Sequence, residues 1–461
     1  MATKRTTTPP PAAPSRPPYM LVEEIRVQGY KSLVDAKLHV RPLTLLAGTN
    51  SSGKSSIMQP LLLIKQTMEA PYTPAGALVL SGAHVQAETA EELLSKVNST
   101  KVFSIALSGM DTYIELMPNM VKPSKRTAIE LVYERNKESF LIKQQEFEFA
   151  DEKISLVPFM PWDELLLQLP ESFKKRFDVS EQGGHVFVEN GFLQLQLSQI
   201  QENRLANIWL SLELENSLAT LMHIPGLRIS PKRSYIATYF QNHIKGTFDI
   251  YAAGTITQWQ EQNDTENLIK LNDYIQRLGL ANSVMARIKN ANEIELSVNR
   301  LPATSKTKPR KADMVNIADV GIGVSQVLPI LVALIAAQEG QLVYIEQPEL
   351  HLHPRAQVVM AELLAEAAKR GVRVIVETHS SLLLLTVQTL VAEGKIKPKD
   401  VGLHWFERDA KGATTVRFEE PDENGAYGDW PEDFGDVELT AQRAYLDAVT
   451  RRQPKRKASA A

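Results

Sequence analysis

The sequence of 461 residues contains no cysteine. Disulfides, thiolate metal sites and cysteine nucleophiles are therefore excluded. No apolar run approaches the ~18–20 residues of a membrane-spanning helix, and no apolar segment follows the basic residues near the start. A strong charge of either sign is missing as well, because 51 basic and 54 acidic residues leave a net charge of −3, which argues against electrostatic coating of nucleic acid over the whole surface. We expect a cytoplasmic protein without membrane contact.

The stretch at residues 43–56 reads LTLLAGTNSSGKSS and predicts a phosphate-binding loop. Residues 43–46 form an apolar run typical of a strand buried on both faces, and an apolar helix is expected over residues 57–64. Between them, the pattern G-x-x-x-x-G-K-[ST] is matched at every fixed position. Glycines let backbone N–H groups approach phosphate oxygens, the lysine reaches the β- and γ-phosphates, and the next hydroxyl is left for Mg²⁺. The predicted ATP-binding residues are Gly48, Asn50, Ser51, Ser52, Gly53, Lys54, Ser55 and Ser56, with Ser55 also a ligand of Mg²⁺.

Before this loop, residues 21–40 alternate between apolar and polar side chains in two short runs separated by Gly29-Tyr30-Lys31, which predicts a β-hairpin. A GYKSL turn followed by GTNSSGKSS resembles the ABC-type ATPase heads of the RecF, SMC and OLD group. These are P-loop ATPases of genome maintenance and prokaryotic defence. The resemblance implies an α/β fold: a P-loop ABC-type ATPase head, with a mixed sheet, flanking helices and an antiparallel β-subdomain, split by a compact α+β insertion. The second half of the head is then expected far downstream.

The motif GIGVSQ at residues 321–326 stands where that group carries its signature motif, before a predicted helix at residues 327–338. Glycines at a helix start permit close backbone approach, and Ser325 and Gln326 offer hydrogen bonds to a phosphate. The resemblance implies that Gly323, Ser325 and Gln326 meet the γ-phosphate bound to the opposite protomer. ATP would then be sandwiched between two protomers, so we expect a homo-oligomer that is at least a dimer.

Two further buried strands are predicted, each followed by a candidate catalytic residue. Residues 342–345 lead to Glu346, which would hold Mg²⁺ through water at the carboxyl end of its strand. Residues 372–376 lead to His379, which matches the switch histidine of the group, a contact of the γ-phosphate or of the attacking water. Gln66 and Gln86 are both candidates for the glutamine that senses Mg²⁺ in that group.

The pair Glu346-Gln347 departs from the group, in which most active members carry two consecutive acids after this strand. An amide can orient water but cannot accept its proton, so the sequence predicts slow hydrolysis or an ATP-operated clamp. Glu349, two residues further on, is the alternative general base. The predicted catalytic residues are therefore Glu346, Gln347, Glu349 and His379. The tract HLHP, with His351 and His353, is interpreted as a structural loop and not as a metal site.

The chain is expected to divide into six parts. They are a disordered tail (1–20), the N-terminal half of the head with the phosphate loop (21–81), an antiparallel β portion and helical insertion (82–314), the C-terminal half of the head (315–408), a small C-terminal element with the run WPEDF (409–450) and a basic tail (451–461).

Periodicity predicts the elements of these parts. Strands are expected at residues 102–107, 113–117, 129–133, 140–149, 401–406 and 414–418, and helices at residues 87–97, 161–177, 198–223, 263–278 and 381–393. The helices at 198–223 and 263–278 are long enough to pair as an αα-hairpin, but neither carries the sustained heptads of a long coiled-coil arm. Basic stretches at residues 228–233 and 305–311 are candidate contacts of a DNA or RNA backbone, and the second is the better one. A solvated linker is the alternative interpretation of that second stretch.

The resemblance implies an ATP-binding ATPase similar to the ATPase subunits of the Septu and PARIS defence systems. It would dimerise around ATP and control a nuclease or toxin subunit, because the sequence has no recognisable nuclease motif of its own. One alternative is a RecF-like DNA-repair clamp that binds DNA directly, and another is a metabolic P-loop kinase. The signature and the switch histidine argue against the kinase, since a kinase does not need a partner's phosphate sensor.

Overall fold

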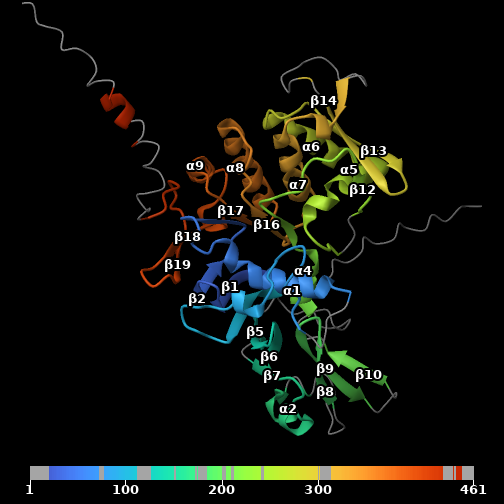
Figure 1. Ribbon diagram of the computed structural model, residues 1–461, viewed down its shortest axis with the longest axis vertical. Coiled ribbons are helices and arrows are strands. Elements are labelled where there is room, and N and C mark those ends of the chain that lie inside the picture. The colour runs from blue at the N-terminus through green and yellow to red at the C-terminus, as the bar shows by residue number, and fades with distance from the viewer. Residues whose placement is uncertain are drawn as a thin grey trace, which may run out of the picture.

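The computed structural model describes residues 20–71, 77–111, 126–149, 152–171, 174, 184–199, 204–208, 212–239, 243–299, 301, 313–428, 440 and 443–448 (Figure 1). Several predictions lie outside these residues. They concern the tail up to residue 19, the strand at 113–117, the basic stretch at 305–311, the WPEDF run at 430–434 and the basic tail at 451–461.

A six-stranded sheet forms the centre of the fold, and its strands follow the order β11-β16-β17-β3-β18-β19. They are β11 (Met222–Ile224), β16 (Leu342–Glu346), β17 (Arg373–Glu377), β3 (Leu43–Gly48), β18 (Val401–Arg408) and β19 (Thr414–Glu419). The strands from β11 to β18 run parallel, and β19 pairs antiparallel with β18 at one edge. The predicted buried strands are confirmed. Their carboxyl ends meet at one edge, which is where open α/β sheets bind ligands.

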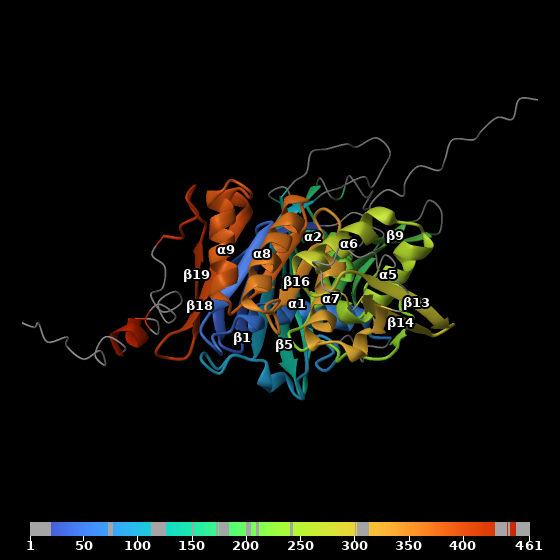
Figure 2. The same cartoon turned by 90° about the horizontal axis from the view of Figure 1, so that it is seen from above.

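Alternate side chains of these strands enter two different cores, because the side-chain period of a strand is two. Leu45 and Ile345 pack with helices on one face, while Leu46 and Tyr344 pack on the other. The first face is covered by α5 (Ala252–Glu261), α6 (Thr265–Arg277), α7 (Ile322–Ala336), α8 (Pro354–Lys369) and α9 (Ser381–Ala392). The second face is covered by α1 (Gln59–Glu69), α4 (Leu212–Thr220) and a second sheet. Figure 1 shows these layers, and Figure 2 shows α5 and α6 on the side of α7 away from β18. The predicted α/β fold with flanking helices is confirmed.

The second sheet is antiparallel and follows the order β2-β1-β4-β5-β6-β7. Its strands are β1 (Met20–Tyr30), β2 (Leu33–His39), β4 (Val102–Asp111), β5 (Arg126–Asn136), β6 (Ser139–Phe149) and β7 (Glu152–Leu156). The predicted hairpin at residues 21–40 and the strands of the predicted meander that lie within the described residues are confirmed. This sheet shares the second hydrophobic core with α1 and α4.

Two smaller sheets complete the strands of the described residues. One contains β8 (Gly184–Glu189), β9 (Phe192–Gln199) and β10 (Arg204–Ile208), and α2 (Trp162–Gln168) precedes it in the chain. The other contains β12 (Tyr235–Ile236), β13 (Val284–Asn290), β14 (Glu293–Asn299) and β15 (Met314–Asn316). A helix was predicted at residues 161–177, but α2 ends at Gln168. The reason is Pro170, which disfavours a helical conformation at the residue before it. Leu169 is accordingly extended, with a ψ of 126°.

The long helix predicted at residues 198–223 is wrong. That segment holds the end of β9, then β10, α4 and β11. All three residues of β11 are buried and pair in parallel with β16, so pairing with a strand far away in sequence overrides the local helical pattern. The predicted αα-hairpin is also wrong, because α6 packs against α5 and α7.

The helix predicted at residues 87–97 is wrong as well, since only Ala90–Glu92 form a 3₁₀ turn. The backbone N–H groups of Ala90 and Ser95 donate to the carbonyls of Glu138 and Gly29, at 3.1 and 2.9 Å. These groups therefore bond to neighbouring turns of the second sheet and not to a preceding helical turn.

Parts of the segment 82–314 belong to the central sheet and to the hydrophobic core on its first face. β11 completes the central sheet, and α5 and α6 share a hydrophobic core with α7. Within the described residues, no helix is long and apolar enough to cross a membrane.

Candidate nucleotide-binding site

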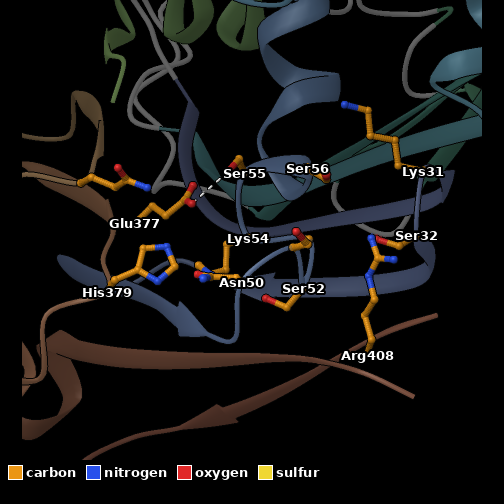
Figure 3. Close-up of a pocket in the computed structure, with 13 residues that line it drawn as sticks. Lys31, Ser32, Asn50, Ser52, Lys54, Ser55, Ser56, Glu377, His379 and Arg408 are labelled. Atoms are coloured by element: carbon orange, nitrogen blue, oxygen red, sulfur yellow. Dashed lines mark hydrogen bonds between the residues drawn. The ribbon is translucent and has the colours of Figure 1, made fainter. Parts of the chain in front are cut away.

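A pocket of about 430 Å³ lies at the carboxyl ends of β3, β17 and β18 (Figure 3). It is lined by Lys31, Ser32, Asn50, Ser51, Ser52, Gly53, Lys54, Ser55, Ser56, Gln347, Glu377, His379 and Arg408. The structure thus brings the predicted loop residues together with Gln347 and His379, although these come from segments about 300 residues apart in the sequence. Gly48 lies at the base of the loop, where β3 ends.

The loop takes its shape because two of its glycines adopt conformations that other residues rarely adopt. Gly48 has a φ of +140°, and a Cβ there would lie 2.1 Å from the carbonyl oxygen of Phe406. Gly53 has a φ of +102°, and a Cβ there would lie 2.6 Å from Oγ1 of Thr414. Oγ1 of Thr414 also donates to the carbonyl of Ser52 at 2.7 Å. The loop is therefore fitted closely against β18 and β19, and a side chain at either glycine would push it away.

Lys54 is the cation of the loop, and only 4% of it is exposed. Its Nζ donates to the carbonyls of Gly48 and Thr49 at 3.1 and 2.7 Å. Burial lowers the pKa of Lys54 from its usual value, although the carboxylates of Glu377 and Glu349 oppose the shift. Ser55 begins a 3₁₀ turn that leads into α1, so the amino end of this helical segment points at the loop. Both the ammonium group and the helix end favour an anion in the pocket.

Glu377 is the carboxylate closest to the predicted metal ligand Ser55. The hydroxyl of Ser55 donates to its Oε1 at 2.9 Å, and the hydroxyl of Tyr344 donates to its Oε2 at 3.1 Å. Burial raises the pKa of Glu377, and the charge of Glu346 adds to this shift. No role was predicted for Glu377 from the sequence. Its position at the end of a strand that pairs directly with β3 was the available signal.

Glu346 lies one strand further from the loop than Glu377, its cross-strand neighbour. Its Oε1 lies 3.2 Å from Nε2 of His223, and its Oε2 accepts a hydrogen bond from the backbone N–H of Gly226 at 3.0 Å. Burial opposes ionisation of Glu346, but these two contacts outweigh it and hold the pKa below its usual value. The predicted metal ligands Glu346 and Ser55 are therefore not in direct contact. Glu377 ends β17, which lies between β16 and the strand β3 that leads into the phosphate loop.

A chain of buried polar contacts continues from His223 to α1. Nδ1 of His223 lies 2.9 Å from Nδ1 of His84, and Nε2 of His84 lies 3.1 Å from Oε2 of Glu69. Glu69 forms an ion pair with Lys65 at 2.9 Å. Burial lowers the pKa of His84, against the opposing effect of Glu69. The chain joins Glu346 to the helix that follows the phosphate loop.

Neither candidate for the Mg²⁺-sensing glutamine lines the pocket. Gln66 lies on α1, accepts hydrogen bonds from the backbone N–H groups of His84 and Val85 and donates to the carbonyl of Val79 at 2.6 Å. Gln86 forms an isolated bridge with Ser81. Gln66 therefore closes the loop that carries His84.

Gln347, Glu349 and His379 take different positions around the pocket. Gln347 lines it, with a φ of +47°, and its backbone N–H donates to the carbonyl of Glu377 at 2.7 Å. Glu349 instead accepts a hydrogen bond from the backbone N–H of His379 at 2.7 Å. Burial raises the pKa of Glu349, whereas burial and the charge of Lys54 lower the pKa of His379. Because this pKa lies below its usual value, the imidazole of His379 is neutral at pH 7. Figure 3 shows the ring beside Lys54 and Glu377.

The predicted signature residues do not line this pocket. Gly323, Ser325 and Gln326 lie in the first turns of α7, which begins earlier than predicted. The hydroxyl of Ser325 donates to the carbonyl of Ile322 at 2.8 Å, and Ser325 is only 7% exposed. The exposed part of the motif is its start, where Ile322 is 47% exposed.

Besides Glu377, three pocket residues were not predicted from the sequence: Lys31, Ser32 and Arg408. Lys31 and Ser32 form the turn of the β1–β2 hairpin, and Arg408 ends β18. Nζ of Lys31 donates to Oε1 of Gln59 at 2.7 Å. In Figure 3 these residues lie on the side of the loop opposite to His379. They add two cations to the pocket, and the GYKSL turn itself was the signal for Lys31.

The other candidate sites of the sequence have ordinary structural contacts. Nδ1 of His353 accepts a hydrogen bond from the backbone N–H of Arg355 at 3.3 Å, and so it caps the amino end of α8. In the basic stretch at 228–233, Arg228 is buried and Arg233 pairs with Asp319 at 2.7 Å. No group of three histidine or acidic residues that could hold a metal ion occurs among the described residues.

The residues present fit a nucleotide with Mg²⁺. The glycine-turned loop has no room for a Cβ at Gly48, Lys54 supplies a cation, and Oγ of Ser52 is buried without a hydrogen-bond partner among the described residues. Ser55, Glu377 and Glu346 offer oxygen ligands, the donors that Mg²⁺ prefers.

Two family models match the chain. "AAA ATPase domain" matches residues 20–182, and "AAA domain, putative AbiEii toxin, Type IV TA system" matches residues 202–385. Both matches are to ATPase domains of the AAA type, and such domains bind nucleotide, usually with Mg²⁺. Among curated proteins, none matches the chain.

Solved structures similar to the chain include heads of SMC proteins. "Crystal structure of the SmcHead bound to the C-winged helix domain of ScpA" has 10% identity and a TM-score of 0.44, and the match covers 87% of this chain and 97% of that one. An Smc head with an extended coiled coil bound to the C-terminal domain of ScpA, from Pyrococcus furiosus, has 10% identity and a TM-score of 0.41, with 94% and 100% covered. The SMC head domain from Thermotoga maritima has 11% identity and a TM-score of 0.36, with 86% and 98% covered.

Proposed function

We propose that this protein is a slow ATPase that binds ATP with Mg²⁺ in the pocket at the carboxyl end of β3. The observation that carries the proposal is that the phosphate loop, Lys54 and the hydrogen-bonded pair Ser55–Glu377 all line one pocket. They supply N–H donors for phosphate, a fixed cation and oxygen ligands for a hard metal ion.

Each residue has a separate role in this proposal. Lys54 and the loop N–H groups bind the phosphates, while Ser55, with Glu377 or Glu346, holds Mg²⁺. The bound metal would neutralise the charge that develops on the phosphates. Gln347 orients the attacking water, and His379 hydrogen-bonds to the γ-phosphate or to that water. Because the amide of Gln347 cannot accept a proton, we expect hydrolysis to be slow.

Dimerisation around ATP is the next part of the proposal. It rests on the resemblance of GIGVSQ to a signature motif and on the exposure of its start, where Ile322 is 47% exposed on the surface of one protomer. The amino end of α7 would then meet the nucleotide held by the other protomer.

We further propose that the ATP-bound dimer acts in the cytoplasm and controls a nuclease or toxin partner in prokaryotic anti-phage defence. The resemblance to Septu and PARIS ATPase subunits supports this, as does the matching family model, whose description names a toxin–antitoxin system. A RecF-like clamp that binds DNA directly has less support. In the basic stretch at 228–233, Arg228 is buried and Arg233 is already paired with Asp319.

Calorimetric titration with ATP and Mg²⁺ tests the nucleotide site. Lys54→Ala should abolish detectable binding, since each charge-assisted hydrogen bond from the ammonium group to a phosphate is worth about 1.5–3 kcal/mol. Lys411→Ala, at an exposed lysine in the turn between β18 and β19, is the matched control and should bind as the parent does. Equal ATP affinity of the parent and the Lys54 variant would contradict the site. Co-purification from the native operon tests the partner, and salt-sensitive DNA binding by the isolated protein would favour the clamp.

A further inference from the structure

Arg228 is a buried arginine whose contacts lie on the turn that carries Gln347. It follows β11 in the chain, and only 6% of it is exposed. Its Nη2 donates to the carbonyl of Glu346 at 2.7 Å and to the carbonyl of Gln347 at 3.1 Å. One guanidinium nitrogen therefore bonds to two consecutive carbonyls at the point where β16 ends.

The backbone of Gln347 needs such support. Its φ of +47° lies in the left-handed region, which a residue with a Cβ adopts only at a cost. Such conformations persist when their surroundings determine them from several sides. Here the N–H of Gln347 donates to the carbonyl of Glu377 at 2.7 Å, and its C=O accepts from Arg228. The first contact ties the turn to β17, and the second ties it to the segment after β11.

The segment that carries Arg228 is itself held on both sides. The backbone N–H of Ile229 donates to Oδ2 of the buried Asp249 at 3.0 Å, and Nε2 of Gln326 donates to the carbonyl of Ile229 at 3.2 Å. The first contact joins it to the 3₁₀ turn before α5, and the second joins it to the first turns of α7. The backbone next to Arg228 is therefore held in place by two other elements, so its guanidinium can hold the turn at Gln347.

Arg228 also retains hydrogen-bonding capacity that the fold does not use. Its Nε and Nη1 are buried and have no hydrogen-bond partner among the described residues. The carboxylates of Asp249, Glu349 and Glu346 surround the guanidinium at longer range, and burial lowers the pKa of Arg228 to about 10, so it remains charged at pH 7. A buried charge is costly, and a neutral apolar side chain of similar size would fill the space more cheaply. The contact with the two carbonyls is therefore what distinguishes arginine here.

We propose that Arg228 is a positioning residue that holds the left-handed turn at Gln347 and thereby keeps the Gln347 side chain in the nucleotide pocket. This inference rests on the proposed ATPase function. Arg228 does not line the pocket, so it acts through Gln347 and not by contact with the nucleotide. Loss of Arg228 should therefore affect the hydrolytic step and leave ATP binding almost unchanged.

Single substitutions test the split between binding and hydrolysis. Arg228→Met keeps the length of the side chain and removes its donors, and Arg228→Lys keeps the charge with a single donor group. Both should lower kcat by about 10–100-fold, the usual consequence of a small misplacement of a catalytic group, with the Kd for ATP within about twofold of the parent. Arg233→Met is the matched control, because Arg233 lies five residues away, is 74% exposed and pairs only with Asp319 among the described residues. It should change kcat by less than about twofold.

A kinetic double-mutant cycle tests whether Arg228 acts through Gln347. In a Gln347→Ala background, adding Arg228→Met should lower kcat by less than about twofold, because the group that Arg228 positions is already absent. If the two reductions in kcat multiply, or if Arg228→Met alone changes kcat no more than Arg233→Met does, the proposal is wrong.

A thermal cycle tests the backbone support without any nucleotide. Without Arg228 the turn at Gln347 should relax and release its strain, which offsets part of the lost stability, whereas glycine accepts a positive φ without strain and has none to release. Arg228→Met should therefore lower Tm more in a Gln347→Gly background than in the parent. Equal decreases in Tm in the two backgrounds would overturn the proposal. Failure of the parent to bind ATP would overturn the proposed function alone, since the thermal cycle would still decide the role of Arg228. Arg228→Lys serves the same cycle if Arg228→Met does not fold.

Discussion

The hydroxyl of Ser55 donates a hydrogen bond to Oε1 of Glu377 at 2.9 Å. Glu377 ends β17, which pairs directly with the strand of the phosphate loop, whereas Glu346 ends the next strand along. The two carboxylates are cross-strand neighbours, but only Glu377 lines the pocket. The oxygens of Glu346 instead contact His223 and Gly226. The carboxylate next to Ser55 is therefore Glu377, and not Glu346, which was the metal ligand predicted from the sequence.

The first prediction separates the two carboxylates. Glu377→Gln should weaken ATP binding in the presence of Mg²⁺ by about tenfold or more, a typical effect when an oxygen partner of a metal site is altered. Glu346→Gln should weaken it less, because its side chain is directed to His223 and Gly226. Both variants should bind ATP equally well in EDTA. Calorimetry with and without Mg²⁺ measures these differences, and a larger effect of Glu346→Gln would assign the metal to Glu346.

The second prediction concerns the general base. Gln347→Glu places a carboxylate at a position that lines the pocket and should raise turnover, since one positioned base is typically worth about 10²–10⁴-fold. Glu349→Gln should change turnover little, because an amide oxygen can still accept the hydrogen bond from the backbone of His379.

Steady-state phosphate release from the parent and both variants decides this question. The opposite pattern, in which Glu349→Gln stops hydrolysis and Gln347→Glu does not accelerate it, would make Glu349 the base and the protein an ordinary ATPase.

The third prediction concerns the dimer. Ser325 is only 7% exposed, so Ser325→Arg would disturb the packing of α7 as well as any contact with a second protomer. Ile322→Arg is the cleaner test, because Ile322 is 47% exposed at the start of the same helix. It should leave ATP binding to each protomer intact and prevent ATP-dependent association. Leu385→Arg, at a 59% exposed position of α9, is the control. ATP-dependent light scattering of Ile322→Arg equal to that of the parent would rule out the proposed sandwich.

The fourth prediction concerns the shape of the loop. Gly48→Ala should lower the free energy of unfolding by more than about 4 kcal/mol, because its Cβ would meet the carbonyl oxygen of Phe406 at 2.1 Å in addition to the strain of a positive φ. Gly394→Ala is the matched control. Gly394 also has a positive φ, +69°, but no atom lies within 4 Å of its Cβ position, so only the strain of about 1–3 kcal/mol applies. Urea unfolding measures both, and similar decreases would show that the contact with β18 is not tight.

Local patterns were sufficient to predict much of the central sheet. The run LTLLAG before GKSS predicted β3, and LVYIE and RVIVE became β16 and β17, because strands buried on both faces must be continuously apolar. Local patterns failed at residues 198–223 and 87–97. There the backbone pairs with β16, or with turns around Gly29 and Glu138, which lie far away in sequence.

The sequence by itself determined the phosphate loop, the strands of the central sheet other than β11, and the residue types available at their ends, since each of these depends on neighbours along the chain. Only the tertiary structure decided which of those residues share a pocket. The order of the strands puts Glu377 beside Ser55 and Glu346 beside His223. The packing of α7 buries Ser325, and Arg228 reaches the turn at Gln347 from a segment more than 100 residues earlier. The physical reason is that strand order and helix packing bring distant segments into contact, and no pattern within a short stretch of sequence records which segments will meet.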